Sequence, residues 1–128
     1  MNHSTAEIYN ASLSYIGDLG DPQGSTDYEA RAPYILASFC NTAKNLDKEL
    51  RKAKGLDPAP AFSPVYISIM ESFPLCDELI VPAAFYLASM LVIESDPELS
   101  SDLYDRYCDS IATIAASNEA IAEKYFRD

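Results

Sequence analysis

Acidic side chains are the most numerous reactive groups in this chain. Its 128 residues include 20 Asp and Glu against 9 Lys and Arg, so the formal net charge is -11. Neighbouring carboxylates can share acid and base roles or bind a hard cation. Acidic residues on the polar side of an amphipathic helix are usually only solvated, however, and no calcium-loop pattern is present. We therefore expect neither catalysis nor metal binding from the candidate pairs, which are Asp77 with Glu78 and Asp102 with Asp105.

The possible nucleophiles lack the partners that would activate them. The only histidine, His3, is near the N-terminus, where segments are often frayed. Cys40, Cys76 and Cys108 are odd in number and widely spaced, which fits reduced and mostly buried thiols better than a disulfide framework. Acidic neighbours do not activate a thiol, so we interpret Cys108 as a core or interface thiol. Because the four glycines form no nucleotide-binding loop either, we predict no enzyme activity and no cofactor.

The acidic balance and the apolar runs also limit the partners of this chain. A surface with a net charge of -11 repels phosphate backbones and anionic lipids, although nucleic acid can pass it without binding. The longest apolar run, residues 79–93, has 15 residues and includes Pro82, whereas a bilayer-spanning helix needs about 20. The first ten residues have no secretory-signal pattern. We therefore expect synthesis in a cytoplasm, no membrane partner and no sequence-specific binding of DNA or RNA.

Helical periodicity predicts an all-α fold for a single domain that comprises residues 1–128. The expected architecture is a small helical bundle of four to five helices with a central apolar helix and a proline-rich loop. Residues 4–7 have the pattern of a capping box, in which a serine and a glutamate satisfy each other's free backbone donors. A first helix therefore begins there, and either Gly17 or Gly20 ends it.

A second helix is predicted in the segment that ends at Gly55. It begins near Thr26, which has a glutamate three residues on, unless Pro33 delays the start to about Ala32. If the helix starts early, the proline should kink it. Apolar residues then recur at helical spacing on one side, with charged residues on the other. The apolar positions are Ile35, Leu36, Phe39, Cys40, Ala43, Leu46 and Leu50.

Two further helices meet at a tight corner. Residues 81–94 are apolar on nearly every face, which predicts a helix in the middle of its neighbours. Asp96 and Pro97 are of the types favoured at the cap and in the first turn of the next helix. If this last helix continues to Ala122, its partners are too short to cover it. We therefore expect the tail of residues 117–128 to touch another subunit.

The proline-rich loop comprises residues 56–76, and its four prolines exclude a long helix. Its alternating run, Val65 to Ile69, is either a short strand or a single helical turn. Loops of this length in a small domain are usually functional or packed by their own side chains. We therefore expect the apolar residues of the loop to dock on the bundle or on a neighbour.

Nine tyrosines, distributed over every element, are a high share for a chain of this length. Tyrosine suits positions where the ring is buried and the hydroxyl reaches a polar rim, which occur in helical bundles and at protein interfaces alike. At a single site ordinary packing is the commoner explanation, but across nine tyrosines some should meet a partner. The predicted interface residues, taken from the loop, the last helix and the tail, are Phe62, Tyr66, Ile69, Tyr104, Tyr125 and Phe126.

Three stretches of sequence resemble a group of small helical proteins encoded with the structural genes of tailed bacteriophages. They are Tyr-x-x-Arg-Ala-Pro at residues 28–33, Leu-Ala-Ser-Met-Leu at residues 87–91 and the acidic corner Asp-Pro-Glu-Leu at residues 96–99. Together with the phrases around them, they cover about three quarters of the chain. On these residues the chain resembles the head-to-tail connector proteins, also called adaptor or head-completion proteins.

The resemblance implies a structural protein of the virion, made in the cytoplasm of a host bacterium. Such a subunit assembles as a ring, commonly a dodecamer, beneath the portal protein and joins the DNA-filled head to the tail. Its partners are other copies of itself, the portal, a stopper or tail-completion protein, and viral DNA that passes through without sequence-specific binding. The acidic balance leaves one alternative open, a binding module that mimics the charge of DNA and inhibits a host nucleic-acid-binding protein.

Overall fold

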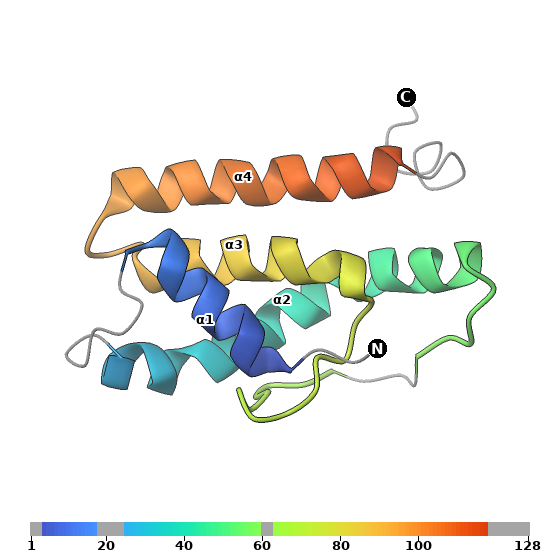
Figure 1. Ribbon diagram of the computed structural model, residues 1–128, viewed down its shortest axis with the longest axis horizontal. Coiled ribbons are helices and arrows are strands. Elements are labelled where there is room, and N and C mark those ends of the chain that lie inside the picture. The colour runs from blue at the N-terminus through green and yellow to red at the C-terminus, as the bar shows by residue number, and fades with distance from the viewer. Residues whose placement is uncertain (1–3, 18–24, 60–62, 118–128) are drawn as a thin grey trace.

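Four α-helices and one short 3-10 turn form the described part of the chain, as the helical periodicity predicts (Figure 1). The computed structural model describes residues 4–17, 25–59 and 63–117. Within these ranges the structure contains no β-strand, and a single isolated bridge joins the backbones of Ser4 and Ser72. The predicted all-α bundle is therefore confirmed. Its elements are α1 (Thr5–Tyr15), α2 (Ser25–Ala53), the 3-10 turn η1 (Asp77–Leu79), α3 (Ile80–Leu91) and α4 (Pro97–Ala116).

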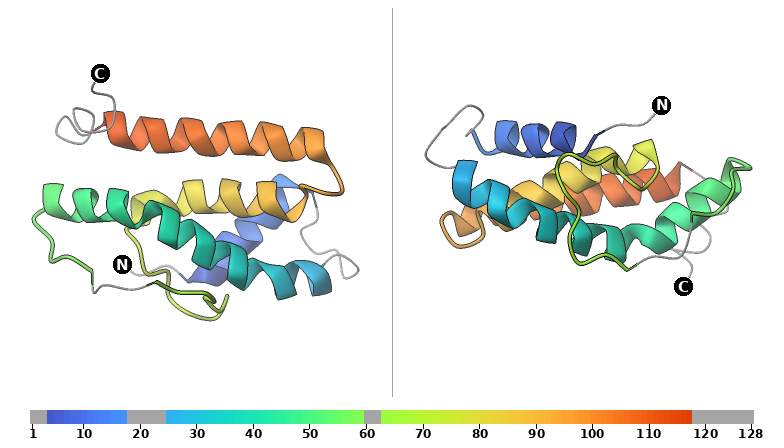
Figure 2. Two further views of the ribbon diagram at one scale, coloured as in Figure 1. Left: turned by 180° about the vertical axis from the view of Figure 1, so that it is seen from behind. Right: turned by 90° about the horizontal axis from the view of Figure 1, so that it is seen from below.

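Helix α3 lies at the centre, and each of the other helices packs against it. Figure 2 shows α1 and α2 on opposite sides of α3, while α4 runs alongside it on a third side (Figure 1). The sequence requires this position, because no charged residue occurs between Leu79 and Ile93. Pro82 is tolerated since it lies in the first turn, where a backbone N–H has no partner within the helix. The prediction of a central apolar helix is confirmed.

The corner between α3 and α4 has the geometry that Asp96 and Pro97 predict. The Asp96 carboxylate accepts a hydrogen bond from the Leu99 N–H at 3.1 Å, and Pro97 occupies the first turn. Nearby, the Ser89 hydroxyl donates to the Ser100 carbonyl at 2.7 Å, and the Ser100 hydroxyl donates to the Ser89 carbonyl at 2.9 Å. Because both serines are buried, these reciprocal bonds fix the pairing of the two helices.

Helix α2 begins at Ser25 and continues through Pro33, so the alternative of a start delayed to Ala32 is wrong. The helix is curved rather than straight (Figure 2), which agrees with a proline inside it. The Pro33 carbonyl accepts a hydrogen bond from the Ile67 N–H at 3.1 Å, so this turn of the helix has a partner in the loop. The helix ends near Gly55, whose φ of 71° favours glycine.

The described part of the proline-rich loop packs against α2 of the same chain. In the middle of α2, the Asn41 amide donates to the Pro64 carbonyl at 2.7 Å. Near the C-terminal end of α2, the Arg51 guanidinium donates to the Pro74 carbonyl at 3.1 Å. The loop therefore docks on the bundle, the first of the two alternatives, through the buried side chains Ile67, Phe73, Leu75 and Cys76.

The tip of the loop also holds the start of α1. The Thr5 hydroxyl donates to the carbonyls of Ser68 and Glu71, and the Thr5 N–H donates to the Glu71 carbonyl at 2.9 Å. The predicted capping box at residues 4–7 is wrong, because the Ser4 hydroxyl makes no capping hydrogen bond. The backbone of Ser4 instead pairs with the loop. A contact between segments far apart in the sequence therefore replaces the local cap.

Two further local predictions have different outcomes. Gly17, with a φ of 77°, follows the end of α1, whereas Gly20 lies outside the described residues. The run from Val65 to Ile69 forms neither a strand nor a helical turn. Instead the chain reverses direction just after it, where the Glu71 N–H donates to a carbonyl three residues earlier at 3.1 Å.

Asp47 is a buried carboxylate that joins α2 to the end of the loop. Only 2% of the residue is exposed. One carboxylate oxygen accepts from the Arg51 guanidinium at 2.9 Å, and the other accepts from the Cys76 N–H at 2.7 Å. Since Arg51 also donates to the Pro74 carbonyl, one ion pair holds the returning arm of the loop in place. A buried charge of this kind stabilises a fold only while its partners remain.

Replacing Asp47 by alanine should destabilise the fold by about 3 kcal/mol, because Arg51 loses its counter-charge and the Cys76 N–H its acceptor. The matched control is Asp27→Ala, which removes the carboxylate of another Asp–Arg pair with i,i+4 spacing on α2. The Asp27–Arg31 pair is largely exposed and should contribute at most about 0.5 kcal/mol. Urea unfolding followed by circular dichroism measures both losses, and equal values for the two variants would contradict this role of Asp47.

Candidate docking face

Charged side chains are unevenly distributed over this acidic chain. Between Glu29 and Asp47, α2 contains no carboxylate and only two cations. Residues 58–70 of the loop and residues 79–93, which include α3, contain no charged residue. These segments meet along α2, so the side of the molecule that they form is nearly neutral. We call its exposed and partly exposed side chains the neutral face, which comprises Ala30, Tyr34, Ser38, Val65, Tyr66, Tyr86 and Met90.

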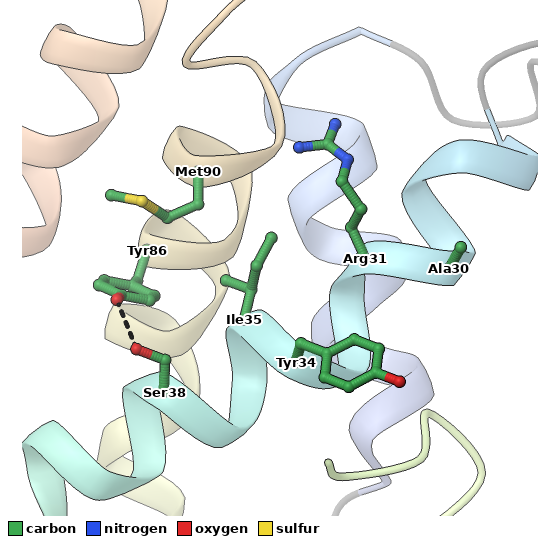
Figure 3. A pocket seen from close by; sticks show the side chains of 7 residues that line it. All are labelled: Ala30, Arg31, Tyr34, Ile35, Ser38, Tyr86 and Met90. Carbon is green, nitrogen blue, oxygen red and sulfur yellow. Dashed lines mark hydrogen bonds between the residues drawn. The ribbon is translucent and has the colours of Figure 1, made fainter. Parts of the chain in front are cut away.

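A shallow groove of about 530 Å³ runs between α2 and α3 within the neutral face (Figure 3). Its side chains are mostly apolar, and its one charged residue is Arg31. The hydroxyls of Ser38 and Tyr86 lie 3.1 Å apart and share a hydrogen bond between the two helices. The groove therefore offers apolar contact rather than acid and base chemistry. We call it the α2–α3 groove, and its lining is Ala30, Arg31, Tyr34, Ile35, Ser38, Tyr86 and Met90.

A second depression of about 510 Å³ continues along α2 towards the loop. It shares Tyr34 and Ser38 with the α2–α3 groove and adds Asn41 and Thr42 from α2 and Val65 from the loop. An exposed helix side normally presents lysine, arginine or carboxylate groups. Here uncharged side chains take their place along the exposed side of α2, so the two depressions form one continuous surface suited to another polypeptide.

Tyrosine rings connect the loop end of the neutral face to α4. Tyr66 packs edge-on against Tyr34, with ring centroids 5.2 Å apart. Beyond the α2–α3 groove, the Tyr86 ring lies 5.3 Å from Tyr107, and Tyr107 lies 5.3 Å from Tyr104. Tyr34, Tyr66 and Tyr104 are 57%, 54% and 43% exposed. Partly exposed rings with hydroxyl tips suit a protein–protein contact, because each offers apolar area and a hydrogen-bonding group.

The structure places two of the predicted interface residues, Tyr66 and Tyr104, at opposite ends of this tyrosine series. Ile69 is partly buried and packs against the core, so less of it is available to a partner. The other three candidates, which lie outside the described residues, are Phe62, Tyr125 and Phe126.

Sequence reasoning missed Tyr34 and Tyr86, which lie in the middle of the series. Tyr34 is flanked in the sequence by a buried proline and an apolar isoleucine, and Tyr86 lies within an apolar run, so their neighbours do not mark them as exposed. The sequence does contain one signal that could have identified Tyr34. Tyr34, Ser38 and Thr42 are spaced four residues apart on α2, so they share one side of the helix, and this side is exposed but uncharged. In a chain with a net charge of -11, such a stripe indicates a contact surface.

Arg31 closes one end of the α2–α3 groove and gives the Tyr-x-x-Arg-Ala-Pro stretch a structural role. Its guanidinium donates to the Leu91 carbonyl at 2.7 Å, so it caps the C-terminal end of α3. It also pairs with Asp27 at 3.0 Å and lies 5.8 Å from the centroid of the Tyr28 ring. Beyond Arg31 a cavity of about 440 Å³ is lined in part by Asp27 and Glu94. We call these two carboxylates the acidic rim.

Burial keeps two of the three thiols unreactive. Cys40 and Cys76 are buried, and burial raises the pKa of Cys40 to about 12 and that of Cys76 to about 11. Cys108 is exposed on α4, so of the two interpretations of this thiol the core position is wrong. Within the described ranges, no group of three or more His, Cys, Asp or Glu side chains is arranged to hold a metal ion.

Comparisons with known proteins do not place this chain in a family. The chain matches no protein-family model, no curated protein and no solved structure. Among the described residues, no helix is both long and apolar enough to cross a membrane. The assignment of a function therefore depends on the neutral face and on the sequence stretches already described.

Raising the pH above about 9 should destabilise the fold. Burial raises the pKa of Cys40 to about 12, of Cys76 to about 11 and of Tyr107 to about 12, from ordinary values of 9.0, 9.0 and 10.0. The unfolded chain therefore releases these protons at a lower pH than the folded chain does. The free energy of unfolding should be insensitive to these groups below about pH 9 and should fall from there to about pH 12.

Urea unfolding at successive pH values from about 7 to 11 measures this fall. The variant Cys40→Ala lacks one of the three buried acids, so its free energy of unfolding should fall less steeply than that of the unmodified chain. A free energy that rises over this range, or an unchanged slope in the variant, would contradict the effect of burial on these groups.

Proposed function

We propose that this protein is a non-enzymatic structural subunit of a tailed bacteriophage, a head-to-tail connector made in the host cytoplasm and incorporated into the virion. Copies of the chain form a ring, commonly a dodecamer, beneath the portal and above a stopper or tail-completion protein. The resemblance at residues 28–33, 87–91 and 96–99 supports this proposal. In the folded chain the first stretch ties α2 to the end of α3, and the third forms the corner that leads into α4.

The observation that carries the proposal is the neutral face on an otherwise acidic subunit. Two copies with a net charge of -11 repel each other wherever their carboxylates meet. A lateral contact between copies therefore needs a surface without carboxylates. The neutral face meets that need, and its exposed rings, Tyr34 and Tyr66, are of the type enriched at the centre of protein interfaces.

The outer side of α4 suits the wall of a channel for DNA. Phosphate groups are repelled by fixed carboxylates, so DNA would slide past such a wall without being held. In the proposed ring, α4 faces the channel while the neutral face meets a neighbour. The carboxylates on this side of α4, all exposed and spaced three or four residues apart, are Glu98, Asp102, Asp105 and Asp109.

The direct test is to locate the chain in particles of the phage that encodes it. A cryo-EM reconstruction of the head-to-tail junction should show this helical subunit as a ring in contact with the portal. Purified chain mixed with purified portal rings should also give a stable complex in size-exclusion chromatography with light scattering. A junction whose density fits no bundle of this topology, or particles that lack the chain, would contradict the proposal.

Tyr34→Ser should lower the incorporation of the chain into particles at least about tenfold, because it removes a central aromatic anchor from the neutral face. Its stability should change by less than about 1 kcal/mol, since the Tyr34 side chain is 57% exposed. The control is Leu56→Ser, which removes an apolar side chain that is 52% exposed outside the neutral face. Quantitative mass spectrometry of purified particles compares the two, and equal incorporation would exclude the neutral face as the lateral contact.

One observation favours a second function, the inhibition of a nucleic-acid-binding protein by charge mimicry. The four exposed carboxylates of α4 form a row of negative charges with one cation, Arg106, among them, and the net charge of the row is that of a stretch of phosphates. In that case the chain should capture a basic host protein from a lysate, and Asp105→Asn with Asp109→Asn should release it while Tyr34→Ser should not. Location of the chain at the phage neck would decide against this second function.

A further inference from the structure

The α2–α3 groove exposes the side of α3 that α1, α2 and α4 leave uncovered. Tyr86 and Met90 on this side are only partly buried within the described structure. The one charged residue of the groove, Arg31, already bonds the Leu91 carbonyl and Asp27. An ion or a nucleotide therefore finds little to bind there. An aromatic side chain, in contrast, gains contact with both walls and has a hydroxyl pair within reach.

The acidic rim determines the charge of what can lie next to the groove. Asp27 and Glu94 are both exposed, and they lie just beyond Arg31. Asp27 is paired with Arg31, so together with Glu94 these three side chains leave a net charge of about -1 at this end of the groove, where a carboxylate is repelled and a cation is attracted. The occupant that fits both features has an apolar centre flanked by positive charges.

We infer that the α2–α3 groove of one subunit binds residues 118–128 of a second copy, a segment with the sequence Asn-Glu-Ala-Ile-Ala-Glu-Lys-Tyr-Phe-Arg-Asp. This segment contains the pair Tyr125 and Phe126 between Lys124 and Arg127, and no other pair of adjacent aromatic residues in the sequence lies between two cations. Tyr125 and Phe126 fill the apolar groove, and the cations beside them, Lys124 and Arg127, provide the charge that the acidic rim attracts. The segment also has three carboxylates, Glu119, Glu123 and Asp128, which in this arrangement lie away from the rim. The inference rests on the proposed function, since it names the lateral partner in the ring.

The positions of the groove and the tail favour a neighbouring copy over the same chain. The groove lies near the C-terminal end of α3, where α4 begins. The 20 residues of α4 span about 30 Å, so Ser117 at its other end is far from the groove (Figure 1). The tail therefore starts from the end of the subunit that is remote from its own groove. A groove at one end and its ligand at the other give a heterologous, head-to-tail contact, the type that forms a ring when the rotation between successive copies closes.

The first experiment measures whether the groove binds this segment. The receptor is the full chain with Tyr125→Ser and Phe126→Ser, which we call the tail variant, so that its own tail does not compete. The probe is a synthetic peptide of residues 118–128, and binding is followed by isothermal titration calorimetry. We expect saturable binding of one peptide per chain. Absence of binding at about 1 mM peptide would overturn the inference, because a contact weaker than this is not specific.

A matched pair of substitutions shows whether the peptide lies in the groove. Met90→Lys keeps the length of the side chain but places a cation where the aromatic rings should sit, and it should weaken binding at least about tenfold. Asn45→Lys adds the same charge at an exposed position of α2 outside the groove and should change the dissociation constant less than about twofold. If Met90→Lys unfolds, Ala30→Lys on the exposed wall of the groove replaces it. Equal binding to the groove variant and the control would overturn the assignment.

The second experiment distinguishes a neighbouring copy from the same chain. The tail variant keeps an intact groove, and Met90→Lys keeps an intact tail. Each variant by itself should sediment as a monomer, whereas an equimolar mixture should form a dimer that cannot grow, because one complementary contact remains. A mixture that stays monomeric above the dissociation constant of the peptide would overturn the contact between copies.

The two proposals can fail separately. A chain that lies at the head-to-tail junction of particles but fails the peptide and mixing experiments excludes the tail contact and leaves the connector proposal standing. A chain that passes both experiments but is absent from particles shows the reverse, a self-associating protein that is not a connector.

Discussion

Most of the apolar side chains in the uncharged run of residues 79–93 must be kept from water, and the rest of the structure depends on meeting this constraint. Burial of each large apolar side chain stabilises a fold by about 2 kcal/mol, so a segment of this kind organises whatever packs on it. Helices α1, α2 and α4 each contribute an apolar stripe to α3. Where α4 packs on α3, Ser89 of α3 and Ser100 of α4 permit a close approach and satisfy each other's polar groups.

The same constraint connects the fold to the proposed function. Three helices cover three sides of α3, and the remaining side, with Tyr86 and Met90, forms one wall of the α2–α3 groove. Carboxylates are absent from α2 between Glu29 and Asp47 and from residues 58–70 of the loop, and they gather on the outer side of α4. An acidic subunit thereby has one surface that another polypeptide can approach without repulsion and a second surface that repels phosphates.

The helices could be predicted because their signals are local. The apolar run at 81–94 and the cap at Asp96 each lie within a few residues of the structure that they determine. The position at which α1 begins was predicted from residues nearby, but the contact that holds this end was not, because the backbone of Ser4 pairs with a loop that is distant in the sequence. For the same reason Tyr34 and Tyr86 escaped notice, since the groove between them exists only once α2 and α3 have packed. The tyrosine content pointed to contact surfaces, but only the packing shows where they lie.

Oxidation of Met90 tests most directly whether the neutral face is where this protein is contacted. Met90 lies in the α2–α3 groove and is partly exposed. Met70, at the tip of the loop, is 84% exposed, so its oxidation rate in the free chain serves as the reference for an accessible methionine. Hydrogen peroxide followed by mass spectrometry gives the rate for Met90 in the free chain and in purified particles. If a partner covers the groove, Met90 in particles should oxidise at least about tenfold more slowly than in the free chain. Equal rates in the two states would contradict a docking role for the neutral face.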